Sequence, residues 1–532
     1  MKKNELYSVE ISDMNNLGAG ICKIDGKVVF VRGGVTEDKL EIGIIKDLSD
    51  YAVARVNKII EPSPIRVENT CPSFKRCGGC AFRHVNYENE KIFKKNYIEN
   101  AFKKVGLSVN IEDVLSTGCP DRYRNKVQYP VGKDWKIGFF AEHSHDIVEV
   151  SDCLAQDDSF KEIIDEIVRF GKEKKIPPYD FESGKGLVRH IYLRKGRGSG
   201  DIMVCLVINS KTMREAPELA RILVSRFPAI KSVILNINEK RTNVILGDKN
   251  ITVYGSDTIE DIFCGLRVKI SPKSFYQVNR ECAELICQKA AELADLKPSE
   301  KLVDLFCGIG TIGLSMIKNY PDSSLIGVEI IPDAVENAKE NASMNEMKNT
   351  NFICGDANSP EISEADVIVV DPPRKGCASE LIKRISEISP SRVIYVSCNP
   401  DTLARDCKLF DAEGYKVTRA FAADMFSRTG HVETVVCLSR KEVEEHIYLD
   451  VNVADLPKTP RTTATYPEIK KYILDKYGFK VSSLYIAQIK DKCGLEKRNN
   501  YNLGEGKSKD LICPPEKEKA ILEAFKYFGM LL

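Results

Sequence analysis

Short, mostly apolar runs alternate with helix-length segments from about residue 283 onward. The runs cover residues 301–306, 325–329, 367–371 and 393–397. Apolar strands between helices are typical of a parallel sheet that helices cover on both faces. Two later runs, 416–418 and 434–438, follow without an obvious crossover helix, which predicts a terminal hairpin. The pattern predicts an α/β, doubly wound domain over residues 266–440.

The N-terminal part has a different pattern, with short β-rich runs at residues 27–31 and 52–56 between clusters of Gly, Asn and Asp. This spacing predicts a small, OB-like β-barrel over residues 1–60. Two prolines, Pro62 and Pro64, end the last strand and mark a boundary. Residues 61–265 are predicted to form a mixed, mostly β central domain, whose helix at about 87–105 could pack on the α/β domain.

The C-terminal part, residues 451–532, reads as a helical appendix. Helix starts are predicted at Thr465, near Ser482 and at Pro515, because these residues cap or open helices. Residues 455–460 carry two prolines and look like a linker. Lysines on the predicted helices suggest that the appendix aids substrate binding, although helix pairs of this kind are more often simple packing units.

Length and composition bound these expectations. A chain of 532 residues is too long for one core, so about three or four domains are expected. No stretch approaches the roughly 18 apolar residues of a spanning helix, and the start lacks a secretory pattern. We therefore expect a soluble, cytoplasmic protein with no membrane partner. The 18 cysteines lie mostly in apolar runs of a long chain, which favours reduced, buried thiols.

The first predicted catalytic strand runs from Asp304 to Phe306 into a glycine-containing turn that holds Gly308 and Thr311. Glycine lets the backbone approach a ligand at the carboxyl edge of such a sheet. The turn lacks both common phosphate-binding spacings. Glu329 ends the next strand and could accept hydrogen bonds from ribose hydroxyls, and Asp356 ends the one after it. Acidic strand ends without a phosphate loop suit S-adenosylmethionine; the alternative is that both residues only cap helices.

The next two strands end in Asp371-Pro372-Pro373-Arg374 and Ser397-Cys398-Asn399-Pro400. A cysteine at this edge suits the methylation of uracil at C5. Uracil C5 is a weak nucleophile toward a methylsulfonium, but a thiolate that adds to C6 converts the ring into an enolate whose C5 can attack the methyl group. A base must then remove the C5 proton. Cys398 fits the thiolate and Glu433 fits the base. Taken singly, each could be structural, but both are expected at one rim together with Asp371.

At these residues the chain resembles the RNA 5-methyluridine methyltransferases, in particular the bacterial rRNA enzymes with a TRAM domain and an iron-sulfur cluster. The resemblance covers about residues 7–440 and keeps the family's order. Its motifs are Cys77-Gly78-Gly79-Cys80, Tyr123-Arg124-Asn125-Lys126, Ser274-Phe275-Tyr276-Gln277-Val278-Asn279, Asp304-Leu305-Phe306-Cys307-Gly308, Asp371-Pro372-Pro373-Arg374, Ser397-Cys398-Asn399-Pro400 and His431-Val432-Glu433. Ser427 departs from the family, which often has proline there.

The resemblance implies a Rossmann-like methyltransferase sheet, a TRAM-like RNA-binding N-terminal domain and methylation of uridine C5, with 23S rRNA as the expected substrate. It assigns Cys398 as nucleophile and Glu433 as base. The residues that it implies for the cofactor and uracil pocket are Gln277, Phe306, Glu329, Asp356 and Asp371. Gly308 and Thr311 of the glycine-containing turn are also expected to bind the cofactor. Alternatives are a tRNA 5-methyluridine enzyme, an amino-group methyltransferase with a similar D-P-P motif, and a non-catalytic RNA-binding assembly factor.

Cys71, Cys77 and Cys80 form a C-x5-C-x2-C cluster. The spacing alone fits an iron-sulfur site or four-thiolate zinc about equally well. The resemblance favours a 4Fe-4S cluster with Cys153 as the fourth ligand, and Cys119 is the alternative. The methyl transfer has no redox step, so a structural role is expected.

The RNA substrate must present an unpaired or flipped base, because a base inside a duplex cannot reach Cys398. Arg122, Arg124 and Lys126, interleaved with Tyr123, could contact RNA, and a solvated basic strand is the alternative. The protein is expected to act as a monomer. Target choice depends on RNA shape, so the residues do not identify the uridine.

Overall fold

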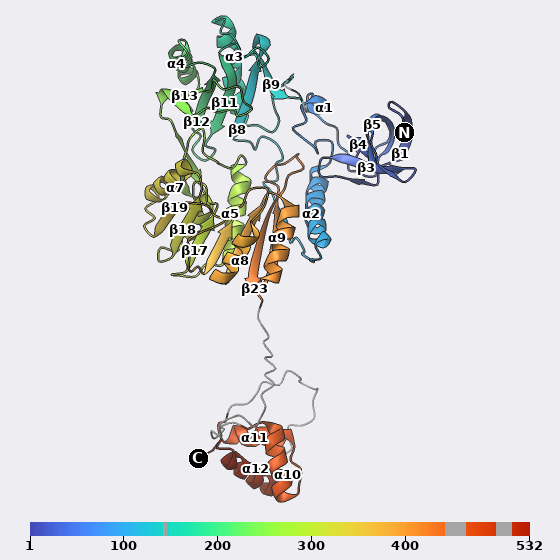
Figure 1. The fold of residues 1–532 in the computed structure, drawn as a ribbon, viewed down its shortest axis with the longest axis vertical. Helices are drawn as coiled ribbons and strands as arrows, with labels where there is room; N and C mark the ends of the chain where they lie inside the picture. Colours follow the sequence, from blue (N-terminus) through green and yellow to red (C-terminus); the bar gives the residue numbers. More distant parts are fainter. Residues whose placement is uncertain (142–143, 145, 151, 442–463, 496–512, 532) are drawn as a thin grey trace. The chain divides into compact units, whose positions relative to one another are not determined.

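The computed structural model describes residues 1–441, except 142–143, 145 and 151, together with residues 464–495 and 513–531. The chain forms two compact units, Met1–Glu442 and Val443–Leu532, and each is described by itself (Figure 1). No helix within the described ranges is long and apolar enough to cross a bilayer.

The N-terminal lobe is a six-stranded sheet with the order β1-β5-β6-β4-β3-β2. Its strands are β1 (Leu6–Glu10), β2 (Asp13–Met14), β3 (Ala19–Ile24), β4 (Lys27–Arg32), β5 (Lys39–Asp47) and β6 (Tyr51–Glu61). β1 also approaches β3, so the sheet curls back on itself around a core that includes Val29, Val31 and Leu40. β6 ends at Glu61, directly before the two prolines. The assignment of this lobe as a TRAM-like domain stays a prediction.

The segment after this lobe contains a short helix, α1 (Phe74–Cys77), and a long one, α2 (Tyr87–Lys104). Asn86 caps α2 by accepting a hydrogen bond from the backbone N–H of Glu88. α2 packs against α9 and β22 of the catalytic sheet through Ile98 and Phe102, which are fully buried. The helix therefore belongs to the catalytic core.

The central lobe is a seven-stranded sheet with the order β10-β9-β8-β11-β12-β13-β14. Its elements are β8 (Lys126–Gly132), β9 (Lys136–Phe140), β10 (Ile147–Glu149), α3 (Ser159–Glu173), β11 (Val188–Lys195), β12 (Ile202–Ile208), α4 (Ala216–Arg226), β13 (Ile230–Ile237) and β14 (Lys249–Gly255). The apolar faces of α3 and α4 join its core. A separate hairpin, β15 (Ile259–Phe263) and β16 (Leu266–Ile270), leads into the catalytic part.

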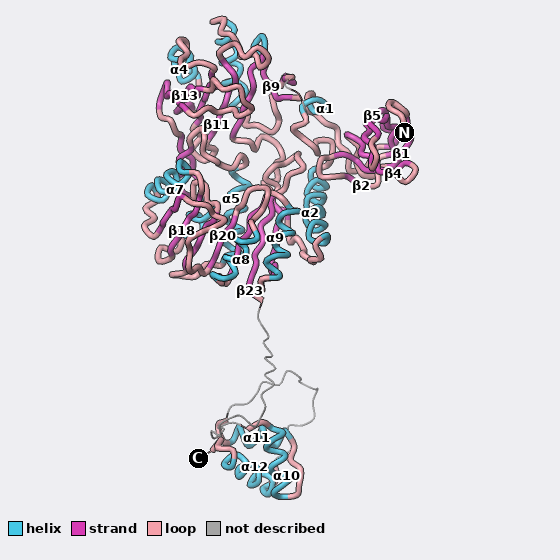
Figure 2. The backbone as a smooth tube through the Cα atoms, in the orientation of Figure 1, coloured by secondary structure: helices cyan, strands magenta, loops and turns pink. Residues whose placement is uncertain are grey.

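The catalytic lobe is an eight-stranded sheet with the order β19-β18-β17-β20-β21-β23-β22-β7. Figure 2 shows strands of this sheet in magenta, with β18, β20 and β23 labelled, among cyan helices. Its strands are β7 (Val114–Leu115), β17 (Lys301–Leu305), β18 (Ser324–Glu329), β19 (Thr350–Cys354), β20 (Val367–Val370), β21 (Arg392–Ser397), β22 (Tyr415–Ala423) and β23 (Glu433–Arg440). The strands from β17 to β21 pair in parallel, and β23 pairs antiparallel with β21 and β22. The predicted doubly wound sheet and its terminal hairpin are thus present.

Helices cover both faces of this sheet. They are α5 (Arg280–Ala294), α6 (Thr311–Ile317), α7 (Pro332–Met344), α8 (Ser379–Ile388) and α9 (Pro400–Ala412). α5, α6 and α7 share one hydrophobic core with one face of the strands, whereas α2, α8 and α9 share a second core with the other face. This explains why the predicted strands are apolar on both sides.

The second unit contains α10 (Tyr466–Tyr477), α11 (Ser483–Lys492) and α12 (Pro515–Tyr527) around its own core. Thr465 and Glu468 form a capping box, Ser482 caps α11, and α12 opens at Pro515, as the sequence predicted. The predicted linker at 455–460 lies outside the described residues.

Candidate active site

The carboxyl ends of β17 to β21 meet the amino end of β23 at one edge of the catalytic sheet. In the antiparallel register of β21 and β23, Ser397 lies opposite Thr434. One residue farther along, Cys398 and Glu433 therefore face the same edge. The parallel pairing of Leu305 with Val370 brings Asp371 beside the turn after β17.

The turn after β17 is held close to β18. Phe306 has a left-handed backbone (φ 67°), which is uncommon for a residue other than glycine. The N–H groups of Phe306 and Cys307 both donate to the carbonyl of Val328. Gly308 and Gly310 follow with φ of 55° and 81°, and Thr311 opens α6. A strained residue at a ligand-facing turn is a feature of functional sites.

Two carboxylates hold this turn through hydrogen bonds from backbone N–H groups. Glu329 accepts hydrogen bonds from the N–H groups of Gly308 (3.1 Å) and Ile331 (2.9 Å). Asp304 is buried, and its Oδ2 accepts from the N–H of Gly313 at 2.9 Å. Its Oδ1 has no hydrogen-bond partner among the described residues, and burial raises its pKa to about 7. Asp304 thus carries a buried oxygen that is left without a partner beneath the turn.

The outer side of this half carries apolar side chains that the sequence analysis did not single out. Ile330 and Ile331, directly after Glu329, are 64% and 55% exposed, and Ile353 near the end of β19 is 38% exposed. Asp356 is exposed, and its carboxylate accepts two hydrogen bonds from Asn358. An apolar surface between two acidic strand ends suits a flat purine ring with polar edges. The two isoleucines directly after Glu329 were the sequence signal that could have identified this apolar surface.

The loops after β20 and β21 are tied together. The side-chain amide of Asn399 donates to the carbonyl of Arg374 at 3.0 Å, and the hydroxyl of Thr402 donates to the same oxygen at 3.3 Å. Burial raises the pKa of Asp371 to about 7. The D-P-P-R loop and the loop of Cys398 therefore form one rigid unit.

Cys398 is half-buried at the end of β21. Burial raises the pKa of its thiol, and the charges of Glu433 and Asp371 raise it further, whereas Arg374 lowers it. The charges of Glu433, Asp371 and Arg374 therefore all act on the thiol of Cys398. Arg374 is the cation that favours the thiolate.

Glu433 is the first residue of β23 and is only 6% exposed. Burial raises its pKa to about 8, Asp371 adds to the shift and Arg374 opposes it. Its carboxylate makes no hydrogen bond or ion pair with any described residue. A buried, unpaired carboxylate with a pKa near neutrality is suited to take up a proton.

Gln277 lies on the loop between β16 and α5, and β11 and the adjacent segment of the central lobe hold this loop. The guanidinium of Arg194 donates to the carbonyls of Ser271 (2.6 Å) and Ser274 (2.9 Å). The side-chain amide of Asn125 donates to the carbonyl of Gln277 at 2.9 Å. Phe275 on the same loop is 68% exposed. The central lobe thus holds the backbone of the loop that carries Phe275 and Gln277.

The four predicted cluster ligands line one cavity of about 340 Å³. They are Cys71, Cys77, Cys80 and Cys153. The alternative ligand, Cys119, is exposed and does not line it. Across the described ranges, no three His, Cys, Asp or Glu side chains converge as a single metal ion would require.

Cations surround these thiols. Arg83, Arg124 and Lys126 line the same cavity, and Arg83 Nε donates to Cys80 Sγ at 3.3 Å. Burial lowers the pKa of Lys126 to about 8, and Arg194 and Arg124 contribute. The free cavity thus holds more positive than negative charge.

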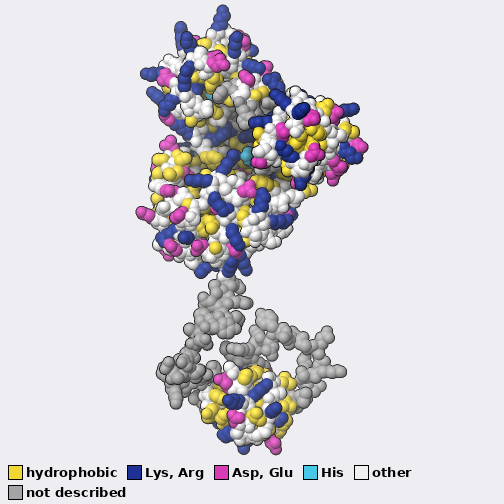
Figure 3. All heavy atoms as spheres, turned by 45° about the vertical axis from the view of Figure 1, so that its right-hand side comes forward, with side chains coloured by type: hydrophobic (Ala, Val, Ile, Leu, Met, Phe, Trp, Pro, Cys, Tyr) yellow, Lys and Arg dark blue, Asp and Glu magenta, His cyan; other side chains and the backbone are white. Residues whose placement is uncertain are grey.

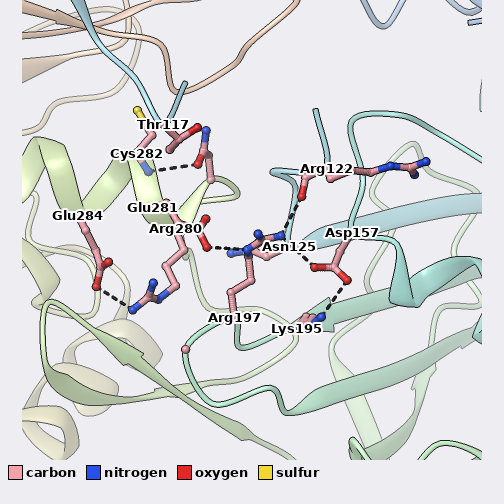
Figure 4. Close-up of polar contacts among 12 residues, drawn as sticks. Thr117, Arg122, Asn125, Asp157, Lys195, Arg197, Arg280, Glu281, Cys282 and Glu284 are labelled. Carbon is pink, nitrogen blue, oxygen red and sulfur yellow. Dashed lines mark hydrogen bonds and ion pairs between the residues drawn. The ribbon is translucent and has the colours of Figure 1, made fainter. Parts of the chain in front are cut away.

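The predicted RNA contact around Tyr123 is partly wrong. Tyr123 is 3% exposed, and its hydroxyl donates to the carbonyl of Ser427, so its ring cannot stack on a base. Arg122 pairs with Asp152 and Asp158. Arg197 joins this segment to α5 by donating to the Arg122 carbonyl, Asp157 and Glu281 (Figure 4). The segment therefore connects lobes.

Basic side chains also mark the outer surface of the first unit. Lys and Arg side chains gather in the hollow where its lobes meet (Figure 3). The net charge of the whole chain is only +1, so this gathering is local. Such a patch is suited to contact phosphate.

A family model described as a methyltransferase domain matches residues 296–442, which contain most of this sheet and its edge. The catalytic lobe is a methyltransferase domain.

Relatives define the family more closely. The chain is 43% identical over 453 residues to an uncharacterized RNA methyltransferase of Clostridium acetobutylicum, a match that covers 83% of this chain and 98% of the relative. An uncharacterized RNA methyltransferase of Clostridium tetani is 39% identical over 449 residues, with 82% and 97% covered. The chain belongs to this family of RNA methyltransferases.

Among solved structures, the fold is similar to the tRNA (uracil-54, C5)-methyltransferase of Pyrococcus abyssi in complex with S-adenosyl-L-homocysteine. The TM-score is 0.69 at 26% sequence identity, and the match covers 81% of this chain and 100% of that chain.

Proposed function

We propose that this protein methylates C5 of a uridine in structured RNA. The observation that carries the proposal is that Cys398 and the unpaired, buried Glu433 face the same edge of the sheet. The turn after β17 lies at this edge as well. The similarity to a tRNA (uracil-54, C5)-methyltransferase supports the choice of base and atom. An amino-methylating enzyme would need neither a thiol nor a buried base here.

Bound S-adenosylmethionine supplies an electrophilic methyl group. The Cys398 thiolate adds to uracil C6, and the electron pair of the C5–C6 double bond moves into an enolate. C5 then attacks the methyl group: the C5–CH3 bond forms as the S–CH3 bond of the donor breaks, its electron pair returns to the donor sulfur, and S-adenosylhomocysteine is the leaving group. Glu433 removes the C5 proton, the double bond re-forms, and the C6–S bond breaks with return of the electron pair to sulfur.

Other residues would orient the two reactants. Glu329, Asp356 and the exposed isoleucines suit the ribose and adenine of the donor, and the free Oδ1 of Asp304 suits a polar group next to the turn made by Phe306, Gly308 and Thr311. Phe275 is suited to stack on a base, and Gln277 and Asp371 suit the polar edge of uracil. The N-terminal lobe would act as a TRAM-like RNA grip.

The test of the mechanism is covalent trapping. The protein is incubated with S-adenosylmethionine and an RNA that contains 5-fluorouridine, which lacks the proton that the base removes. A band shifted on a denaturing gel, absent with Cys398→Ala, supports the proposal. Rapid methylation without any adduct would contradict it and favour an amino-group methyltransferase.

We propose 23S rRNA as the substrate, with tRNA as the alternative outcome. The experiment maps 5-methyluridine in rRNA and tRNA from a strain that lacks this gene. Loss of a 23S rRNA site supports the proposal, and loss confined to tRNA contradicts it. No loss in either RNA would favour an assembly factor.

We further propose that Cys71, Cys77, Cys80 and Cys153 hold a 4Fe-4S cluster. Four thiols around one wide cavity suit a cluster, which separates its thiolates farther than one ion does. A cluster with four thiolates is anionic, and the three cations of the cavity would balance it. Anaerobically purified protein should carry about four irons per chain. Cys77→Ser should lose the brown chromophore and Cys119→Ser should keep it; stoichiometric zinc would contradict the cluster.

A further inference from the structure

The segment 424–432 connects β22 to β23 and is the last stretch of chain before Glu433. It has no regular secondary structure, but three distant parts of the first unit hold its backbone. The N–H groups of Ala81 and Phe82 donate to the carbonyl of Arg428 at 2.7 and 3.1 Å. The hydroxyl of Tyr123 donates to Ser427, and the amide of Asn279 donates to Met425.

A buried ion network from α2 fixes the same segment. Lys94 is 1% exposed, and its ammonium donates to Glu90 (2.8 Å) and to Asp424 (2.5 Å), which are 0% and 1% exposed. The other Asp424 oxygen accepts from the hydroxyls of Tyr87 (2.6 Å) and Ser427 (2.7 Å). Every strong donor and acceptor in this part of the network is therefore engaged.

The network continues toward the base. Lys94 also donates to the carbonyl of Phe426 at 3.3 Å, an oxygen that accepts from both the N–H and the hydroxyl of Thr429. The Thr429 hydroxyl oxygen in turn accepts from the N–H of His431 at 3.2 Å. An unbroken chain of hydrogen bonds thus runs from the ammonium to a residue two positions before Glu433.

Arg428 closes the network on its other side. Its N–H donates to Glu90 at 2.7 Å, and its guanidinium lies 3.3 Å from the second Glu90 oxygen and donates to the carbonyl of Val85. The two cations, Lys94 and Arg428, balance the two carboxylates. The charges are thus paired without any group from outside the segment and α2.

This arrangement is better suited to fix a conformation than to add stability. Removal of two opposite charges from water costs roughly as much as their attraction returns, and an apolar replacement of the same volume is often as stable. A fixed conformation matters here because a displacement of about 1 Å can reduce a catalytic rate by about a hundredfold. The segment also has no slack at Gly430, where an added Cβ would lie 1.6 Å from the carbonyl oxygen of Asn16.

We propose that Lys94 is a positioning residue for the proton-removal step: it holds segment 424–432 in the conformation that presents the Glu433 carboxylate to the C5 proton. The inference rests on the proposed uracil chemistry and adds a residue on α2 that touches neither substrate nor cofactor. It acts after Cys398 has added and the methyl group has been transferred. Loss of Lys94 should therefore slow the last step more than the first two.

The test compares Lys94→Met with Glu433→Gln. For Lys94→Met we expect kcat to fall by about 100-fold, KM for RNA to change little, and the methylated covalent adduct to accumulate on a denaturing gel, as with Glu433→Gln. Binding of S-adenosylhomocysteine should stay near the wild-type value and reports an intact fold. Lys95→Met, one position along α2, is the matched control and should behave as wild type, because Lys95 is partly exposed and its ammonium lies near Glu99.

A second variant keeps the test decisive if the single change leaves too much buried negative charge for folding. Lys94→Met/Glu90→Gln removes one charge of each sign and should give the same trapped adduct. Turnover within about threefold of wild type, or slow turnover without an adduct while Glu433→Gln does trap one, overturns the role of Lys94. Absence of an adduct from Glu433→Gln as well would instead overturn the proposed function.

Discussion

The acidic residues at the strand ends lie in opposite surroundings on the two halves of the catalytic sheet edge. Asp304 lies inside β17, is buried, and is not one of these strand-end residues. On the half formed by β17 to β19, Asp356 is exposed, and its hydrogen bonds from Asn358 lower its pKa. Glu329 likewise accepts from two backbone N–H groups. On the half formed by β20 to β23, burial raises the pKa of Asp371 to about 7 and that of Glu433 to about 8.

This difference separates recognition from chemistry. An ionised carboxylate fixed by N–H groups can accept further hydrogen bonds from a ribose or an adenine without exchanging a proton. A buried carboxylate whose pKa lies near neutrality can take a proton and release it in the same cycle. One sheet edge therefore performs both tasks because burial changes along it.

The largest effect is expected at the nucleophile. Cys398→Ala should abolish methyl transfer, because no other group can add to uracil C6, and should leave the affinity for S-adenosylmethionine within about threefold. Methyl incorporation and isothermal titration measure the two quantities. Full methylation by this variant would show that Cys398 is not the nucleophile, and the half of the edge formed by β20 to β23 could then not be assigned to chemistry.

The next effect is expected at the base. Glu433→Gln should lower kcat by roughly 100- to 10,000-fold, the range of general base catalysis, and trap the adduct. Cys437→Ser, farther along β23, serves as a control for perturbation of the strand. Normal turnover by Glu433→Gln would assign the proton to another group.

The same variant should also change stability in a pH-dependent way. The folded pKa of Glu433, about 8, lies above its ordinary 4.5, so the folded state binds this proton more tightly and loses stability as pH rises from 4.5 through 8. Glutamine removes that loss. Glu433→Gln should therefore melt higher than wild type at pH 8, with a smaller difference at pH 5.

On the recognition half, Glu329→Gln should weaken S-adenosylmethionine binding by about 10- to 100-fold, because charge-assisted hydrogen bonds contribute about 1.5–3 kcal/mol. At saturating donor, kcat should be nearly unchanged. Glu336→Gln on the exposed side of α7 is the control. A loss of kcat with unchanged affinity would mean that the two halves are not separate.

A smaller effect is expected from the charge of Arg374, which lowers the pKa of both Cys398 and Glu433. Both groups must lose a proton to act, so kcat/KM should rise between pH 6 and 9. Arg374→Gln should shift this profile to higher pH by roughly one unit. Lys383→Gln, exposed on α8, should leave the profile in place.

The smallest effect is expected from removal of the C-terminal unit, since every group assigned to chemistry lies in the first unit. We propose that the C-terminal unit aids binding of long RNA. Truncation after Lys441 should leave turnover of a short hairpin nearly unchanged and raise KM for long rRNA by a few-fold, with the difference shrinking at high salt. An equal loss of kcat on both RNAs would contradict this.

The sequence predicts features whose causes are local. Apolar strands with polar ends predicted the sheet and the positions of Cys398 and Glu433, and capping chemistry predicted the helix starts at Thr465 and Ser482. Distant partners were not predictable. From the sequence alone, Lys94 and Glu90 have the spacing of an ordinary surface ion pair on a helix. The contact of Lys94 with Asp424, 330 positions away, buries the pair and could not be predicted. From the sequence alone, Tyr123 is an aromatic residue between basic side chains. Its burial against the loop at Ser427 could not be predicted, because that loop is distant in the chain.

The span of the Lys94 network has a consequence for biosynthesis. Glu90 and Arg428 are 338 positions apart, so α2 leaves the ribosome long before its partners exist. Contacts of such long sequence separation form late, because a large loop must close first. In the nascent helix, Lys94 and Glu90 can neutralise each other as an i,i+4 pair. Glu433 is therefore positioned only after almost the whole first unit has been translated, and incomplete chains should not methylate RNA.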